Sequence, residues 1–147
     1  MPKADGGWQT CDDYKLVFRA IASSTNERTL ISAIIPKKVV CNHNVTVVVT
    51  NELSKNRYSD MLYLMGLANS LVLDWVIRIE GSTYLKFGSL YRLPIPKLPT
   101  KDKAYQSIIQ RSARLICISP EFDDLAKEVG LKSHKDGATE SAERAKL

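Results

Sequence analysis

The sequence has few cysteines and no long uninterrupted apolar run. Its three cysteines, Cys11, Cys41 and Cys117, are odd in number and widely spaced, which argues against a disulfide-built scaffold and favours a reducing compartment. The N-terminus lacks the apolar core of a secretion signal. The apolar stretch 61–77 is short for a membrane span and contains Asp74. We therefore expect a cytoplasmic protein without a membrane partner.

Sequence motifs of catalysis are also missing. The chain contains no glycine-rich phosphate loop, no paired His–Glu metal motif and no strand-to-helix serine elbow. Cys41 and His43 are separated by one residue, but two ligands do not complete a zinc site and the other cysteines lack the spacing for one. We therefore predict that this chain is not catalytic by itself and that it has no metal site and no cofactor of its own.

The charge that is present is positive and lies mainly in the first two thirds of the chain. The net charge is +5, with a pI near 9.1. Residues 1–99 hold 12 Lys/Arg and 8 Asp/Glu, a balance of +4, whereas residues 100–147 hold 9 and 8, a balance of +1. Such an excess is compatible with an anionic partner such as nucleic acid, although many intracellular proteins share it.

Apolar periodicity predicts an α+β fold. Alternation over 14–22 indicates a half-buried strand with its cations on the polar face, and 28–35 is apolar on both faces, as in a central strand. The polar turn 23–27 joins these strands as a hairpin, and 45–49 is a third strand. We expect a small, mostly antiparallel sheet packed on a long apolar helix, followed by a helical C-terminal segment.

The long helix is expected to run from Asp60 to about Ile79. It is apolar nearly all round, except for a narrow polar stripe of Ser70, Asp74 and Arg78 at four-residue spacing. Because side chains four residues apart are neighbours on a helix surface, we expect Asp74 and Arg78 to form an ion pair.

Four segments are expected along the chain. They are a flexible lead-in (1–12), a folded core (13–99), a segment with helices over 102–118 and 119–129 (100–130), and a frayed polar tail that ends in the start of a helix (131–147). The core ends in the proline-rich strap Leu93-Pro94-Ile95-Pro96. Proline disfavours helix at these positions and removes backbone donors, so the strap is expected to be extended.

Cations, asparagines and a tyrosine near the predicted turns are the candidate DNA contacts. Arg and Lys bind phosphates, and Asn can pair with the edge of adenine. Solvated loop ends have the same composition, so the residues alone leave both interpretations open. The candidates are Arg28, Lys37, Lys38, Asn42, Asn44, Lys55, Arg57, Tyr84 and Lys86.

Four stretches together resemble one family. They are "LVFRAIASSTNERTLISAIIP" (16–36), "LMGLANSLVLDWVIR" (64–78), "STYLKFGSLYRLPIPKLP" (82–99) and "SARLICISPEFDDLAKEVG" (112–130). In this order they resemble the C-terminal target recognition domain, of the TaqI-like specificity type, of type IIG-like restriction–modification DNA methyltransferases.

The resemblance implies sequence-specific recognition of double-stranded DNA by a non-catalytic part of a larger enzyme. The core 13–99 would be the target recognition core, and 100–130 a helical spacer or docking segment. Methylation, expected at adenine N6, would be carried out by a methyltransferase domain of the same polypeptide, and that domain would bind S-adenosylmethionine. The gap between the third strand and the long helix, residues 51–58, is shorter than in the family, so part of the base-reading surface is expected elsewhere.

Two alternatives stay open. The chain can instead be a structural docking domain of the same enzyme with little DNA contact. A nuclease would need convergent acids and a lysine, for which Asp12, Asp13, Glu27 and Lys15 are the candidates near the sheet.

Overall fold

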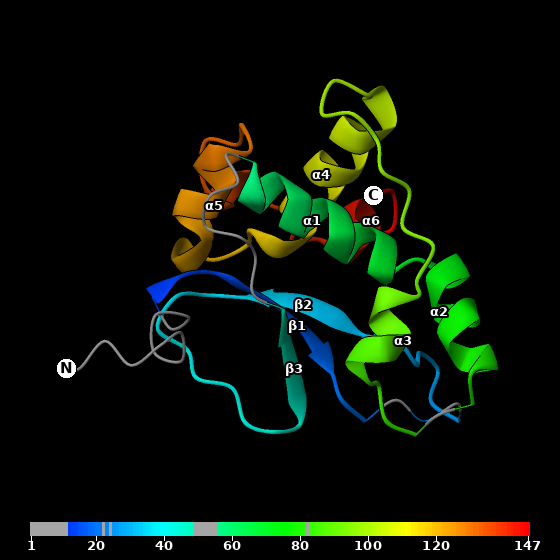
Figure 1. The fold of residues 1–147 in the computed structure, drawn as a ribbon. Helices are drawn as coiled ribbons and strands as arrows, with labels where there is room; N and C mark the ends of the chain where they lie inside the picture. The colour runs from blue at the N-terminus through cyan, green and yellow to red at the C-terminus, as the bar shows by residue number, and fades with distance from the viewer. Residues whose placement is uncertain (1–11, 22, 24, 49–55, 82) are drawn as a thin grey trace. The chain divides into compact units, whose positions relative to one another are not determined.

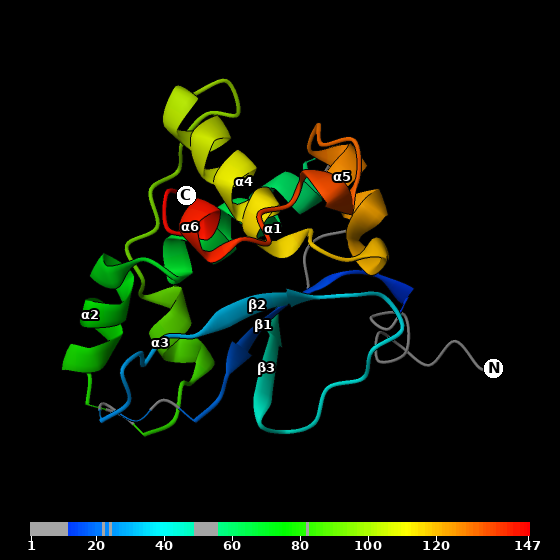
Figure 2. The same cartoon turned by 180° about the vertical axis from the view of Figure 1, so that it is seen from behind.

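Strand β1 (Lys15–Arg19) is the central strand of a three-stranded sheet. It lies between β2 (Ser32–Ile35) and β3 (Val45–Val48) and is antiparallel to both (Figure 1 and Figure 2). The structure is a computed structural model that describes residues 12–21, 23, 25–48, 56–81 and 83–147. The predicted α+β class and the predicted hairpin of the first two strands are confirmed.

The order of the strands differs from the prediction. The segment 28–35 was expected to be central, but β2 is an edge strand and β1 occupies the centre. The central position of β1 agrees with its burial. Leu16 and Phe18 are buried on one face of the strand, and Lys15 and Val17 are buried on the other. The expected polar outer face of the first strand is therefore wrong, and the buried Lys15 ammonium reaches the Asp13 carbonyl at 3.3 Å.

The long helix expected from Asp60 to Ile79 is two helices, α1 (Arg57–Ala68) and α2 (Leu71–Ile79). The break falls at Asn69 and Ser70. The Ser70 hydroxyl accepts a hydrogen bond from the Leu73 backbone N–H (3.3 Å) and so caps α2. Ser and Asn favour caps because their side chains satisfy backbone groups that a helix end leaves open.

Asn69, at the break between the two helices, forms hydrogen bonds to the sheet. Its side chain accepts from the Ser32 backbone N–H (3.1 Å) and donates to the Ser32 carbonyl (2.9 Å). These are backbone groups of the edge strand β2, which an uncovered edge would leave unpaired. The amide of Asn69 therefore ends one helix and protects the edge of the sheet.

The described residues fall into two compact units. The first holds the sheet, α2 and α3 (Phe87–Tyr91), and the second holds most of α1 and everything from Pro96 onward. The boundary in the chain falls inside the predicted strap, between Ile95 and Pro96. No regular secondary structure occurs from 93 to 99.

The second unit is helical. Helix α4 (Lys103–Ile116) begins at the N-cap Asp102, whose carboxylate accepts from the backbone N–H groups of Ala104 and Tyr105. The Tyr105 hydroxyl binds Asp60 of α1 (2.5 Å), and its ring lies 4.7 Å from that of Tyr63. Three short elements follow α4: η2 (Pro120–Phe122), α5 (Asp123–Glu128) and η3 (His134–Asp136).

The C-terminal residues are packed rather than frayed. Helix α6 (Ser141–Arg144) follows η3, and Ala138 between them is fully buried. The Ala138 N–H donates to the Arg114 carbonyl of α4 at 2.7 Å, and the Arg114 side chain pairs with Glu143 of α6. The polar composition of residues 131–147 did not predict this packing, because the main contacts are made by backbone groups and by the small buried side chain of Ala138.

Among the described residues, no single helix is long and apolar enough to cross a membrane. Helices α1 and α2 reach that length and hydropathy only when they are counted together across the break between them.

Candidate nucleic-acid interface

Two loops meet at the end of β1, and the backbone of Ala20 joins them. The Ala20 N–H donates to the Asn44 carbonyl (2.9 Å), and the Ala20 carbonyl accepts from the Leu85 N–H (2.8 Å). A further antiparallel bridge pairs Ile21 with Tyr84. Asn44 and Leu85, which are 41 positions apart in the sequence, are thereby both bound by one residue at the end of the strand.

Four predicted contact residues lie at this end of the sheet. Asn42, Asn44 and Lys86 are exposed, and Tyr84 is 59% exposed. The Asn42 side chain accepts from the Asn44 backbone N–H (3.1 Å), which fixes the turn before β3. The site therefore presents two amides, a phenol and an ammonium group on a loop pair that the sheet orders.

Helix α3 continues directly from this loop and presents aromatic side chains that sequence reasoning did not select. Phe87 is 52% exposed and Tyr91 is 84% exposed. Their rings lie 6.4 Å apart between centroids. The four-residue spacing of Phe87 and Tyr91 was the signal available in the sequence, because it places both rings on one helix face.

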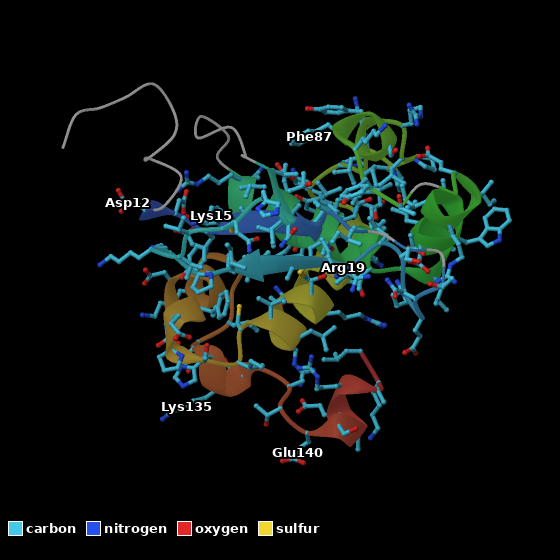
Figure 3. All side chains as sticks on the ribbon, turned by 90° about the horizontal axis from the view of Figure 1, so that it is seen from below. Asp12, Lys15, Arg19, Phe87, Lys135 and Glu140 are labelled. Atoms are coloured by element: carbon cyan, nitrogen blue, oxygen red, sulfur yellow. The ribbon has the colours of Figure 1, made fainter. Side chains whose placement is uncertain are left out.

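Arg19 is a further residue that does not figure among the candidates chosen from the sequence. Its Nε donates to the Ile21 carbonyl (2.8 Å), which keeps the guanidinium at the same end of β1. Its Nη2 is buried and has no hydrogen-bond partner in the part of the chain that the structure describes. Figure 3 shows Arg19 at the strand end, with Lys15 at the start of the same strand.

Arg28, in contrast, is bound inside the first unit. Its guanidinium donates to the carbonyls of Asn69 (2.5 Å) and Ser70 (3.2 Å), and it lies 3.7 Å from the Asp74 carboxylate. These carbonyls follow the end of α1, where a cation is favourable. These contacts give Arg28 a structural role that does not require binding to DNA.

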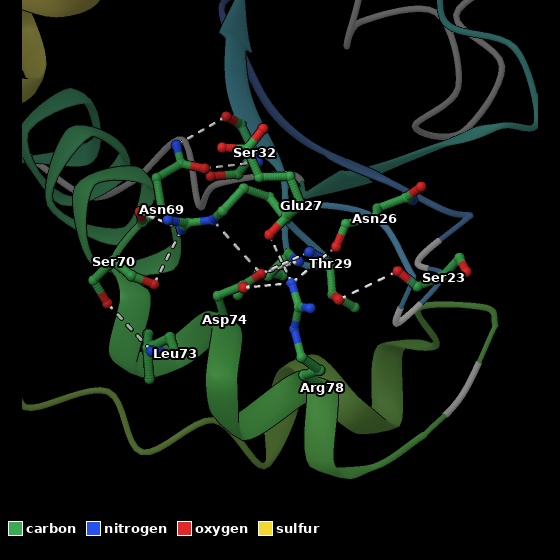
Figure 4. Close-up of polar contacts among 12 residues, drawn as sticks. Ser23, Asn26, Glu27, Thr29, Ser32, Asn69, Ser70, Leu73, Asp74 and Arg78 are labelled. Atoms are coloured by element: carbon green, nitrogen blue, oxygen red, sulfur yellow. Dashed lines mark hydrogen bonds and ion pairs between the residues drawn. The ribbon is translucent and has the colours of Figure 1, made fainter.

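Asp74 is the centre of this network (Figure 4). Its carboxylate accepts from the backbone N–H groups of Thr29 and Leu30, both at 2.7 Å, and pairs with Arg78 at 3.3 Å, so the predicted Asp74–Arg78 pair is confirmed. Burial alone would raise the pKa of Asp74. The two N–H groups and the flanking arginines outweigh burial and hold that pKa below its ordinary value.

The remaining candidates lie apart from the four residues at the Ala20 end of the sheet. Lys37 and Lys38 follow β2 at the other end of the sheet, where the Lys37 ammonium lies 5.0 Å from the centre of the Tyr14 ring. Arg57 belongs to the second unit and donates to the Tyr58 hydroxyl (2.7 Å). Lys55 and the lead-in up to Cys11 lie outside the described residues.

Helix α2 presents an apolar face to solvent. Leu71 is 74% exposed and Trp75 is 63% exposed, and Val72 and Ile79 are exposed beside them. With a helix period of 3.6 residues these four side chains share one face, and the opposite face holds Asp74 and the buried Leu73 and Ile77. The two charges of this helix, Asp74 and Arg78, are both engaged with the loop before β2.

Residues of the nuclease alternative do not gather in the described part of the chain. Asp12, Asp13 and Lys15 lie at the start of β1, whereas Glu27 lies in the turn beyond its other end. Among the described residues, no group of three or more His, Cys, Asp or Glu side chains is placed to hold a metal ion.

Comparison of this chain with protein-family models, with curated proteins and with solved structures finds no significant match.

Proposed function

We propose that the first unit is a target recognition domain that binds double-stranded DNA through the surface around Ala20. The observation that carries the proposal is the joining of the Asn44 and Leu85 segments by the Ala20 backbone. This joining brings four of the residues selected from sequence alone, Asn42, Asn44, Tyr84 and Lys86, to one end of the sheet.

The chemistry of this surface suits DNA. Lys86 supplies a phosphate contact, and the amides of Asn42 and Asn44 can donate to and accept from base edges. The first unit carries nine Lys/Arg and six Asp/Glu, a balance of +3 over 1–50 and 67–95. Lys37 and Lys38 are proposed as separate phosphate contacts at the other end of the sheet, and Arg28 is proposed as an organiser of the fold.

The resemblance of the sequence extends the proposal to the biological setting. The domain would position DNA for a methyltransferase domain of the same polypeptide. That domain would bind S-adenosylmethionine and methylate adenine N6, and the chain described here would take no part in the chemistry.

A salt titration of binding to a mixed-sequence duplex tests this function. Each phosphate contact releases counterions, so the logarithm of the binding constant should fall linearly with the logarithm of salt concentration. Selection of tight-binding duplexes from a random pool then gives the target sequence. Absence of binding at low salt would overturn the proposed function.

A second candidate function, docking onto the methyltransferase domain, is favoured by the apolar face of α2. Leu71, Val72, Trp75 and Ile79 form a neutral surface, which desolvates easily because no charge must be buried with it. If docking is the function, Trp75→Glu abolishes binding to that domain. Unchanged binding by Trp75→Glu would dismiss the docking role of this face.

A further inference from the structure

Strand β3 forms one edge of the sheet and pairs with β1 on one side only (Figure 1 and Figure 2). The hydrogen bond from the Ala20 N–H to the Asn44 carbonyl fixes which backbone groups of this segment face β1. Successive residues of a strand point these groups in opposite directions, so those of Thr46 face β1 and those of Val45 and Val47 point away from it. The outer edge of β3 is therefore made by the backbone of Val45 and Val47.

Three of the four outward groups at this edge are unpaired in the described part of the chain. The Val45 N–H donates to the Asn42 carbonyl (3.2 Å) within the turn before the strand. The Val45 carbonyl, the Val47 N–H and the Val47 carbonyl have no hydrogen-bond partner among the described residues. A row of such groups at a sheet edge is a template for pairing with another strand.

The opposite edge of the sheet is protected. The Arg19 N–H donates to the Ile31 carbonyl of the β2 side, so the next residue, Ser32, points its backbone groups outward. Both of these groups are bound by the Asn69 side chain. Because β2 is blocked at Ser32, pairing through β3 joins two copies of the sheet rather than a continuous fibre.

The chemistry of the β3 edge selects a neutral partner strand. Residues 39–51 contain no Lys, Arg, Asp or Glu, although edge strands commonly carry such charges, which prevent pairing. The strand consists of valine and threonine, which favour extended structure. A charged peptide would lose hydration here without gaining an ion pair. An identical strand matches this edge in charge and in side-chain type.

We propose that β3 pairs antiparallel with β3 of a second copy of this chain, across a two-fold axis at Thr46. In this register the Val47 N–H of each copy donates to the Val45 carbonyl of the other. The two-fold axis forms both bonds at once, because donor and acceptor lie on the same strand. The two Thr46 side chains are opposite each other, a favourable cross-strand pair. The two three-stranded sheets become one continuous sheet. This inference goes beyond DNA recognition and does not depend on it.

Analytical ultracentrifugation of the whole chain over a range of concentrations tests the dimer. We expect a species of twice the 16.5 kDa mass of one chain to form as the concentration rises. Amide hydrogen exchange adds a readout at single residues. The Val47 N–H should exchange more slowly in the dimer than in the dilute monomer, whereas the Thr46 N–H, which faces β1, should be protected in both. A monomer at every concentration overturns the proposal.

Charged substitutions at the axis assign the dimer to β3. Thr46→Lys and Thr46→Glu each place like charges opposite each other, so each variant alone should lose the dimer. An equimolar mixture of the two should restore it, because lysine then lies opposite glutamate. A loss caused by misfolding would not be restored by mixing. Val40→Lys is the matched control, since it adds the same charge to the same uncharged segment at an exposed position before the strand, and it should dimerise as the wild type does.

A proline at Val47 tests the backbone bond itself. Proline lacks the N–H and is tolerated in an edge strand where that group points away from the sheet, so Val47→Pro should fold and remain monomeric. If this variant does not fold, the two Thr46 variants and their mixture decide the question. A dimer that persists in both Thr46 variants overturns pairing through β3. If Trp75→Glu instead removes that dimer, the contact lies on α2.

Discussion

The carboxylate of Asp74 lies 2.7 Å from the backbone nitrogen of Thr29. The same oxygen accepts from the next N–H along the chain, that of Leu30, also at 2.7 Å. Thr29 and Leu30 are both buried and precede β2, so their N–H groups would otherwise have no water to bind. A carboxylate on α2 therefore positions the second arm of the β-hairpin.

Asp74→Ala should lower the free energy of unfolding by about 3 kcal/mol. The substitution leaves two buried N–H donors and two arginines without their acceptor, and each buried donor left unsatisfied costs about 1–3 kcal/mol. Denaturant unfolding at neutral pH measures the change. Glu27→Ala is the control, because the Glu27 side chain is exposed and its carbonyl rather than its carboxylate binds Arg78. Equal effects of the two substitutions would contradict the role of Asp74.

The contact between Asp123 and His134 should make the free energy of unfolding fall as the pH is lowered into the acid range. The His134 backbone N–H and ring Nδ1 both lie 2.8 Å from Oδ1 of Asp123, and these bonds lower the pKa of Asp123 in the folded state. Stability from a lowered carboxyl pKa is present above the unfolded-state pKa of about 3.9 and is lost as the pH falls through the folded-state value. The stability difference between wild type and Asp123→Asn should therefore shrink below about pH 4.

Carbon NMR of the Asp123 carboxyl group gives an independent reading of this contact. His134→Ala keeps the backbone N–H but removes the ring, so the pKa of Asp123 should move part of the way back to its ordinary value. A titration of Asp123 that is the same in wild type and His134→Ala would rule out the ring contact.

Gly137→Ala should destabilise the second unit by about 2 kcal/mol or more, as overpacking of a close contact does. A Cβ at this position would collide with the carbonyl oxygen of Cys117 and would lie 2.9 Å from that of His134. Both are backbone atoms that cannot rotate away. The φ angle of Gly137 is −71°, so space rather than conformation requires glycine.

Gly88→Ala is the matched control for this substitution. A Cβ there would meet only Nη1 of Arg92, at ordinary contact distance, in a helix that alanine favours. We expect its thermal unfolding midpoint to be unchanged or slightly raised. A similar loss in both variants would show that the collision at Gly137 is relieved by movement of the chain.

The two described cysteines should react at very different rates with an alkylating reagent. Cys117 is fully buried, and burial followed by the charge of Asp123 raises the pKa of its thiol to about 12. Cys41 is partly exposed. Since the thiolate is the nucleophile, iodoacetamide at pH 8 should modify Cys41 readily and Cys117 only after denaturation. Peptide mass spectrometry distinguishes the two sites, and rapid native labelling of Cys117 would be the contrary result.

Lys86→Ala should weaken DNA binding on all sequences and lower the magnitude of the salt slope by about one unit, the value for one lost phosphate contact. Lys135→Ala is the control, since Lys135 is exposed but lies on η3 of the second unit. Arg28→Ala should act differently, because Arg28 holds Asn69 and Asp74; it should lower the stability and leave the salt slope unchanged. An unchanged slope in Lys86→Ala would remove this residue from the interface.

Much of the secondary structure follows from the sequence. The hairpin of β1 and β2, helix α4 and the Asp74–Arg78 pair were all predicted, because alternation, helical periodicity and four-residue spacing act between near neighbours. Asn42, Asn44, Tyr84 and Lys86 were selected by residue type and by their position near predicted turns. Whether these residues bind DNA stays a prediction, but their residue types and turns were evident without a structure.

Only the tertiary structure decided the strand order, the helix break at Asn69 and the use of Arg28. The Asn69 amide binds Ser32 across 37 positions, and Arg28 binds the Asn69 carbonyl across 41. A local pattern carries no information about a partner so far away. The apolar run over 61–77 therefore does not reveal the helix break at Asn69, which a strand edge distant in the sequence stabilises. Burial on both faces of β1 and the meeting of two loops at Ala20 have the same origin, since each depends on which segments the folded chain brings together.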